Sequence, residues 1–132
     1  MTVFADTSAI YAVLDQSDAH HGRAMALWKR LLTDSDIIVT SNYVLLETSA
    51  LVQQHLGIPA LRALHEDFSP LLAIEWVSEH AHKAAVEATL TASRKKLSVV
   101  DCVSFQLMRA AGIRAAFCFD HHFREQGFEL LP

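Results

Sequence analysis

A carboxylate stands between a short apolar run and the start of a helical pattern in Thr2-Val3-Phe4-Ala5-Asp6-Thr7-Ser8-Ala9-Ile10. An apolar run of this length predicts a buried strand, so Asp6 lies at a strand-to-helix turn. In parallel α/β folds, ligands bind at the carboxyl ends of strands, which makes Asp6 a candidate site residue. An aspartate in this position is also typical of the N-cap of a helix, here one over residues 8–14. The sequence leaves both interpretations open.

Strand and helix signals alternate along the rest of the chain. Apolar residues at helical spacing and capping residues predict helices over residues 8–14, 20–32, 42–55, 59–68, 79–90 and 99–111. Short apolar runs predict further strands over residues 37–39, 71–77 and 115–119 and a last edge strand over residues 128–131. This alternation predicts a three-layer α/β/α fold with a central parallel sheet of about four to five strands, in a single domain over residues 1–132.

The composition narrows the class of protein. With 52% hydrophobic and 20% charged residues, the chain is typical of a globular domain, and no apolar stretch is long enough to span a membrane. The N-terminus lacks the order of a signal peptide, so we expect a cytoplasmic location. Cys102 and Cys118 have no metal or redox spacing and are expected to be reduced, packed thiols. The net charge of −4 gives no overall attraction to nucleic acid, so a contact with RNA needs a local basic cluster or a bound cation.

Three further carboxylates occupy informative positions. Glu47 lies within an apolar stripe of the predicted helix over residues 42–55, where an unpartnered carboxylate is costly. The alternative is an exposed Glu47 on a helix that buries another side. Asp101 lies in the first turn of an apolar helix, where Ser98-x-x-Asp101 also matches a capping box. Asp120 directly follows the predicted strand over residues 115–119, as Asp6 follows the first strand.

The predicted fold brings these carboxylates toward one edge of the sheet. Four carboxylates that converge without basic partners repel one another, which raises their pKa values. A hard divalent cation removes this conflict, and Mg²⁺ and Mn²⁺ favour carboxylate and water oxygens. A cation held in this way is suited to phosphodiester hydrolysis, because it orients a phosphate and activates water. The eight histidines lack zinc-like spacing, and the sequence assigns no catalytic or ligand role to them, the pair His121-His122 included.

These features together resemble the PIN-domain nucleases, and within them the VapC-type toxins of type II toxin–antitoxin pairs. The motifs that carry the resemblance are Asp6-Thr7-Ser8, Glu47 in a helix, Leu97-Ser98-x-x-Asp101 and Phe119-Asp120-x-x-Phe123 followed by Gly127-Phe128. The resemblance implies a Mg²⁺- or Mn²⁺-dependent endoribonuclease that cleaves structured RNA such as tRNA or rRNA. It also implies a homodimer and an antitoxin protein whose C-terminal segment blocks the acidic pocket.

The resemblance further implies a role for individual residues. Asp6, Glu47, Asp101 and Asp120 would be the catalytic and metal-binding acids, and Ser8 would help to position a metal-bound water or a phosphate. Cys118 departs from the family pattern, because many relatives have Thr or Ser two residues before the last acid.

Two other functional classes stay open. A housekeeping PIN-type RNA-processing nuclease would have the same site and would differ by lacking a short antitoxin-like reading frame before its gene. A non-enzymatic or different Mg²⁺-dependent α/β domain would show Asp-x-Asp or an acidic pair after the first strand, which Asp6-Thr7-Ser8 does not. Several basic residues are predicted to be solvated unless they border the acidic pocket, where they could contact RNA. They are Arg23, Lys29, Arg30 and the run Arg94-Lys95-Lys96.

Overall fold

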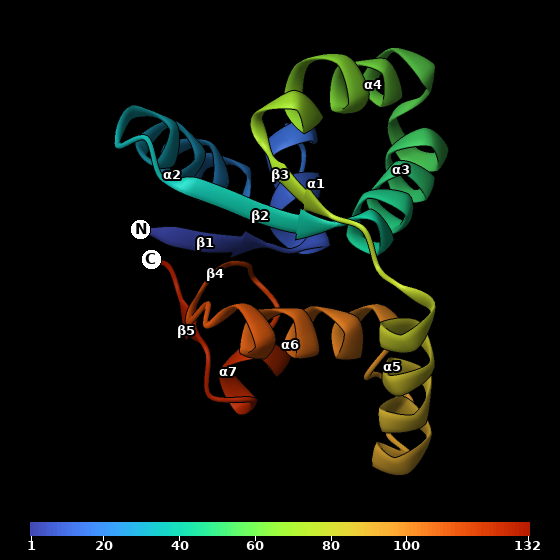
Figure 1. The fold of residues 1–132 in the computed structure, drawn as a ribbon. Helices are drawn as coiled ribbons and strands as arrows, with labels where there is room; N and C mark the ends of the chain where they lie inside the picture. The colour runs from blue at the N-terminus through green and yellow to red at the C-terminus, as the bar shows by residue number, and fades with distance from the viewer.

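The computed structural model describes residues 1–132 and has an all-parallel, five-stranded sheet with the strand order β3-β2-β1-β4-β5. The strands are β1 (Thr2–Ala5), β2 (Ile37–Ser41), β3 (Ala73–Glu75), β4 (Ala115–Phe117) and β5 (Glu129–Leu130). The helices are α1 (Thr7–Leu14), α2 (His21–Thr33), α3 (Asn42–Leu56), α4 (Ile58–Ala63), α5 (Glu79–Ala92), α6 (Val99–Ala111) and α7 (His122–Glu125). Figure 1 shows α1 to α4 on one side of the sheet and α5 to α7 on the other, which confirms the predicted three-layer fold.

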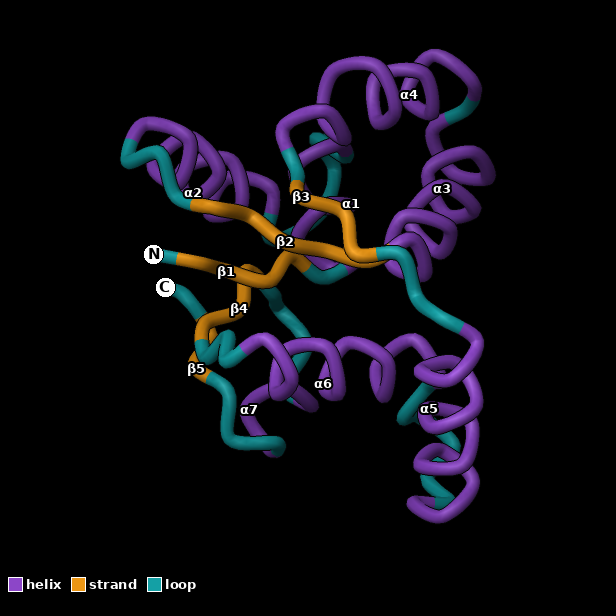
Figure 2. The backbone as a smooth tube through the Cα atoms, in the orientation of Figure 1, coloured by secondary structure: helices purple, strands orange, loops and turns teal.

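The order of the strands reverses next to β1. From β1 the chain moves outward through β2 to β3, and it then crosses back to form β4 and β5 on the other side of β1 (Figure 2). The pairs Phe4↔Val39 and Phe4↔Ala116 show that β1 is hydrogen-bonded to β2 and β4 in parallel register. In an open α/β sheet such a reversal opens a crevice at the carboxyl ends of the two strands, and ligands bind there. The fold therefore places a site beyond the ends of β1 and β4.

Buried aromatic side chains support the chain that follows β4. Phe4 and Phe117, on the two neighbouring strands, are fully buried, as expected for strands covered on both faces. Phe123 in α7 is also fully buried, and its ring lies 6.2 Å from the ring of Phe4 and 5.0 Å from that of Phe105 in α6. This packing anchors the short segment between β4 and α7.

The strand β4 ends earlier than the sequence predicts. The apolar run continues to Phe119, but the strand stops at Phe117, so Asp120 lies three residues beyond it. Beyond Phe117, side chains accept hydrogen bonds from the backbone in place of a neighbouring strand. The backbone N–H of Phe119 donates to the Ser8 hydroxyl (3.0 Å), and that of Asp120 donates to the Cys118 thiol (3.1 Å). The prediction of a strand over residues 115–119 was wrong at its C-terminal end, because these side chains draw the backbone away from the ladder.

The strand β3 is shorter than predicted as well. The predicted strand over residues 71–77 begins too early, because Ser69–Leu71 form a 3₁₀ turn that contains a proline. It ends too late, because the N–H of Val77 donates to the side chain of Asn42 (2.8 Å) and leaves the sheet. The predicted helix over residues 59–68 is α4 and a π-helical turn that continues it over Leu64–Phe68. No helix combines the length and apolarity needed to cross a membrane.

Candidate active site

Asp6 caps α1 and is at the same time a buried acid. Its Oδ2 accepts hydrogen bonds from the backbone N–H (3.3 Å) and the hydroxyl (2.9 Å) of Ser8. Only 4% of the residue is exposed, and this burial raises the pKa of Asp6 to about 6 despite the two hydrogen bonds from Ser8. The negative charges of Asp101 and Asp120 contribute to the rise, so these groups lie near enough to interact. The N-cap predicted for Asp6 is therefore present, and the same side chain is a buried acid near Asp101 and Asp120.

Asp101 also caps a helix and is at the same time a largely buried acid. The predicted capping box is present: the N–H of Ser98 donates to Oδ2 of Asp101, and the N–H of Asp101 donates to the Ser98 hydroxyl, both at 3.0 Å. The residue is 9% exposed, and burial raises the pKa of its carboxyl, with a further contribution from the charge of Asp120. The capping box holds the carboxylate in place at the N-terminus of α6.

Asp120 and His122 form a tight turn at the start of α7. The N–H of His122 donates to Oδ1 of Asp120 at 2.9 Å. The His122 side chain is buried, and its ring Nδ1 lies 2.8 Å from the same oxygen, but off the direction that a hydrogen bond requires. Asp101, Asp120 and His122 can each offer one ligand atom, and these atoms lie within 4.8 Å of one another. The sequence assigns no role to His122, and its place beside Asp120 could be expected only from the Asp-x-His spacing, in which an aspartate commonly accepts from the N–H two residues on.

Cys118 connects Asp6 with Asp120. Its Sγ lies 3.7 Å from Oδ2 of Asp6 and 3.4 Å from the backbone oxygen of Asp120. Burial and then the charge of Asp6 raise the pKa of the Cys118 thiol, so the group stays protonated and acts as a weak neutral donor. The two cysteines are free and buried as predicted, but Cys118 is part of the site as well as of the core.

Ser8 and Glu47 differ in how firmly they are held. The Ser8 hydroxyl donates to Asp6 and accepts from the N–H of Phe119, so it orients Asp6 and ties α1 to the segment after β4.

Glu47 lies on α3, which packs against α1 and α6. Its side chain is half-buried at the edge of the buried face of α3 rather than in the middle of an apolar stripe. It forms no hydrogen bond or ion pair, and the close group of ligand atoms does not include it.

The three aspartates share one feature that suits a cation. Each uses one carboxylate oxygen for its local contacts, Oδ2 in Asp6 and Asp101 and Oδ1 in Asp120, and leaves the other oxygen without a hydrogen bond. No lysine or arginine forms an ion pair with any of them; the basic side chains nearest to one of them are the imidazoles of His121 and His122 beside Asp120. Free carboxylate oxygens are ligands that suit Mg²⁺ or Mn²⁺, so the aspartates present fit such an ion.

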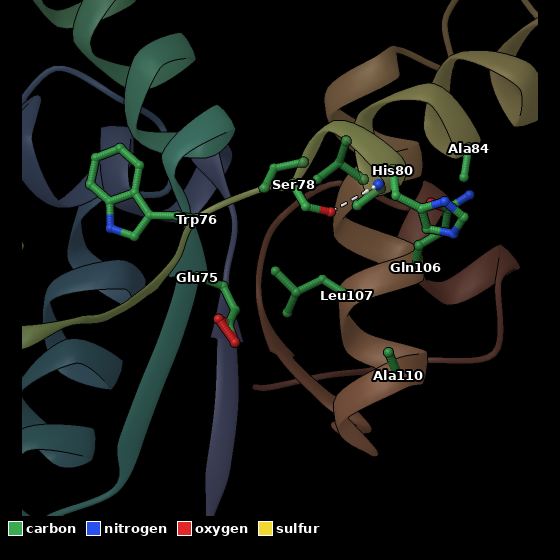
Figure 3. A pocket seen from close by; sticks show the side chains of 11 residues that line it. Glu75, Trp76, Ser78, His80, Ala84, Gln106, Leu107 and Ala110 are labelled. Atoms are coloured by element: carbon green, nitrogen blue, oxygen red, sulfur yellow. Dashed lines mark hydrogen bonds between the residues drawn. The ribbon is translucent and has the colours of Figure 1, made fainter.

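A separate apolar hollow lies away from these acids. It has a volume of about 340 Å³ and is formed by the end of β3, α5 and α6, with Trp76, Leu107 and Ala110 among its lining residues (Figure 3). None of the three aspartates lines it. The acidic site is therefore distinguished by its chemistry and by its place at the strand reversal, not by the size of its cavity.

Comparison with known proteins agrees with this geometry. The model of the PIN domain family matches residues 3–129, and the chain belongs to this family. It is 34% identical over 132 residues to the 23S rRNA-specific endonuclease VapC20 of Mycobacterium tuberculosis, a match that covers 98% of each chain. The resemblance to VapC-type PIN proteins inferred from the motifs is thus confirmed.

Two solved structures show the same fold. The crystal structure of M. tuberculosis VapC20, described as a sarcin–ricin loop cleaving toxin, gives a TM-score of 0.81 at 34% identity and covers 96% of this chain and 95% of that chain. The structure of FitAcB from Neisseria gonorrhoeae gives a TM-score of 0.68 at 16% identity, with coverage of 100% and 97%. The second comparison concerns the fold alone.

Proposed function

We propose that this protein is the toxin of a type II toxin–antitoxin pair and a divalent-metal-dependent endoribonuclease that cleaves structured RNA. The observation that carries the proposal is the group of carboxylates at the strand reversal, each with a free oxygen and none with a lysine or arginine partner. Similarity to VapC20, which is named as a 23S rRNA-specific endonuclease, supports the reaction and the kind of substrate.

In this proposal the side chains have distinct tasks. Asp101, Asp120 and His122 would hold a Mg²⁺ or Mn²⁺ ion, with Asp6 beside them and Glu47 as a more distant acid. When bound, such an ion supplies a Lewis acid that activates water and stabilises charge on the phosphate. Ser8 orients Asp6 through its hydroxyl, and the capping box with Ser98 orients Asp101.

The proposed RNA substrate and protein partners follow from the similarity to VapC20. We propose the sarcin–ricin loop of 23S rRNA as the first substrate to test, because the similar toxin VapC20 is described as cleaving that loop. A cognate antitoxin and a homodimer complete the proposal, and the protein would act in the cytoplasm. Exposed Leu46 (73%) and Trp76 (75%) supply apolar surface for a contact between protein chains.

Removal of divalent metal tests the proposed reaction. We expect purified protein, freed of any partner, to cleave a synthetic sarcin–ricin stem-loop RNA with Mg²⁺ or Mn²⁺. Excess EDTA should lower the initial rate at least about 100-fold, because no lysine or arginine pairs with the acids of the site and could replace the ion there. Added Mn²⁺ should restore the rate, which controls for unfolding. Cleavage that persists in EDTA would refute the mechanism.

Sequencing of RNA ends after expression separates the toxin from a housekeeping nuclease. The toxin proposal predicts new 5′ ends at one or a few sites of mature rRNA or tRNA. A processing nuclease would produce ends at the borders of precursor RNAs instead. A short antitoxin-like reading frame before the gene would support the toxin proposal independently.

A further inference from the structure

We propose that a basic cavity next to the acidic site binds a phosphate of the RNA strand that flanks the cleaved bond. The inference rests on the proposed function and adds the site that holds the substrate. The cavity has a volume of about 350 Å³, within the range of about 300–1,000 Å³ typical of ligand sites. The side chains that give it its character are His20 and Arg23 from the start of α2, and Phe119, His121 and Arg124 from the segment after β4.

The cavity adjoins the acidic site directly. Cys118 lines the cavity, and its Sγ also lies 3.7 Å from Oδ2 of Asp6. Phe119, another lining residue, donates its N–H to the Ser8 hydroxyl, which in turn donates to Asp6. An RNA strand with one phosphate at the acidic site therefore has neighbouring phosphates within reach of this cavity.

The two arginines that line the cavity have no acidic side chain as a partner. No aspartate or glutamate lines it, and neither Arg23 nor Arg124 forms an ion pair. Three of the other lysine and arginine residues, Arg62, Lys83 and Arg94, form ion pairs at 3.0 Å, and the rest, like Arg23 and Arg124, form none. In a chain with a net charge of −4, two unpaired guanidinium groups beside one cavity form the kind of local cluster that RNA binding requires.

Aromatic stacking holds part of this cluster in position. The ring of His20 is parallel to that of Phe119, with an interplanar angle of 4° and a centroid distance of 4.4 Å. The guanidinium carbon of Arg23 lies 5.4 Å from the centroid of the same ring, a cation–π contact. A guanidinium that is already ordered loses less freedom on binding, and its planar fork suits two oxygens of a phosphate.

Neutral substitutions of the two arginines test the proposal. The variants are Arg23→Gln/Arg124→Gln and, as a matched control, Lys29→Gln/Arg30→Gln, which removes the same charge from residues of α2 that do not line the cavity. Binding of a fluorescent sarcin–ricin stem-loop RNA is measured by anisotropy in EDTA, where no cleavage is expected, over a series of salt concentrations.

The expected result is a loss of RNA affinity of at least about 10-fold in Arg23→Gln/Arg124→Gln and less than about 3-fold in the control. The slope of log K against log salt should also fall by roughly 1.4, since each phosphate contact to a single strand contributes about 0.7. Equal affinities of the two variants, or no RNA binding by any of the proteins, would overturn the proposal.

The two proposals fail in different ways. The binding assay contains no metal and reads no cleavage, so a protein that cuts RNA in a metal-dependent manner but binds it equally with and without the two arginines contradicts only the cavity. RNA binding that depends on the arginines, combined with cleavage that survives EDTA, contradicts only the metal mechanism.

Discussion

Replacement of Asp101 with asparagine should lower the rate of RNA cleavage at least about 100-fold at saturating Mg²⁺, equivalent to about 3 kcal/mol of barrier. Asparagine has the same shape, and its side-chain oxygen can still accept from the N–H of Ser98, so the cap of α6 is kept. The substitution removes one negative charge from the group formed by Asp101, Asp120 and His122, whose ligand atoms lie within 4.8 Å of one another. Initial rates on the stem-loop RNA measure the effect.

Two other variants make this result specific. Asp67→Asn removes a charge from an exposed position and should leave the rate unchanged. Glu47→Gln should cause a smaller loss than Asp101→Asn, because Glu47 is outside the group formed by Asp101, Asp120 and His122. A loss below about 3-fold in Asp101→Asn, with an unchanged melting temperature, would remove Asp101 from the mechanism.

Replacement of Asp6 with asparagine should stabilise the metal-free protein at pH 7.5. The pKa of this carboxyl is about 6 in the folded chain against 3.8 as its ordinary value, so the folded state binds the proton more tightly than the unfolded state. Protonation of Asp6 therefore favours folding below pH 4, and this contribution is lost as the pH rises through about 6. The ionised group costs the folded state up to about 3 kcal/mol at pH 7.5, which asparagine avoids.

Thermal unfolding in EDTA across pH 4 to 8 measures this effect. The melting temperature of Asp6→Asn should exceed that of the wild type by several degrees at pH 7.5, and the difference should shrink toward pH 4. Added Mg²⁺ should reduce the difference at pH 7.5, because it stabilises the wild-type site by mass action and has less to bind in the variant. Asp67→Asn controls for a general change of charge. A variant that melts below the wild type throughout would contradict the burial of an uncompensated charge at Asp6.

Local patterns in the sequence were sufficient to place Asp6 and Asp101 at helix starts next to the core. Both lie at the start of a helix, where an apolar run before or after the carboxylate shows that the residue is near the core. The order of strands and helices likewise fixed the parallel sheet, because alternation leaves few other arrangements. The position of Asp120 at the end of β4 was approximate, since side chains of Ser8 and Cys118 end the ladder from a distance in sequence.

Contacts between distant segments could not be read from the pattern. The nearness of His122 to Asp101 depends on the turn after β4 and on the packing of α7 against the core. Arg23 is exposed, as the sequence predicts, but only the structure shows that it lines a cavity together with Cys118. Glu47 shows the opposite case, because helical periodicity suggested deeper burial than α3 provides.

The most direct test of the acidic site is a crystal structure of the protein soaked in Mn²⁺, with anomalous data collected to locate the ion. We predict one strong peak about 2.1 Å from oxygens of Asp101 and Asp120, with His122 beside it. No peak among these side chains at a Mn²⁺ concentration that supports full cleavage, or a peak bound only by other residues, would contradict this prediction.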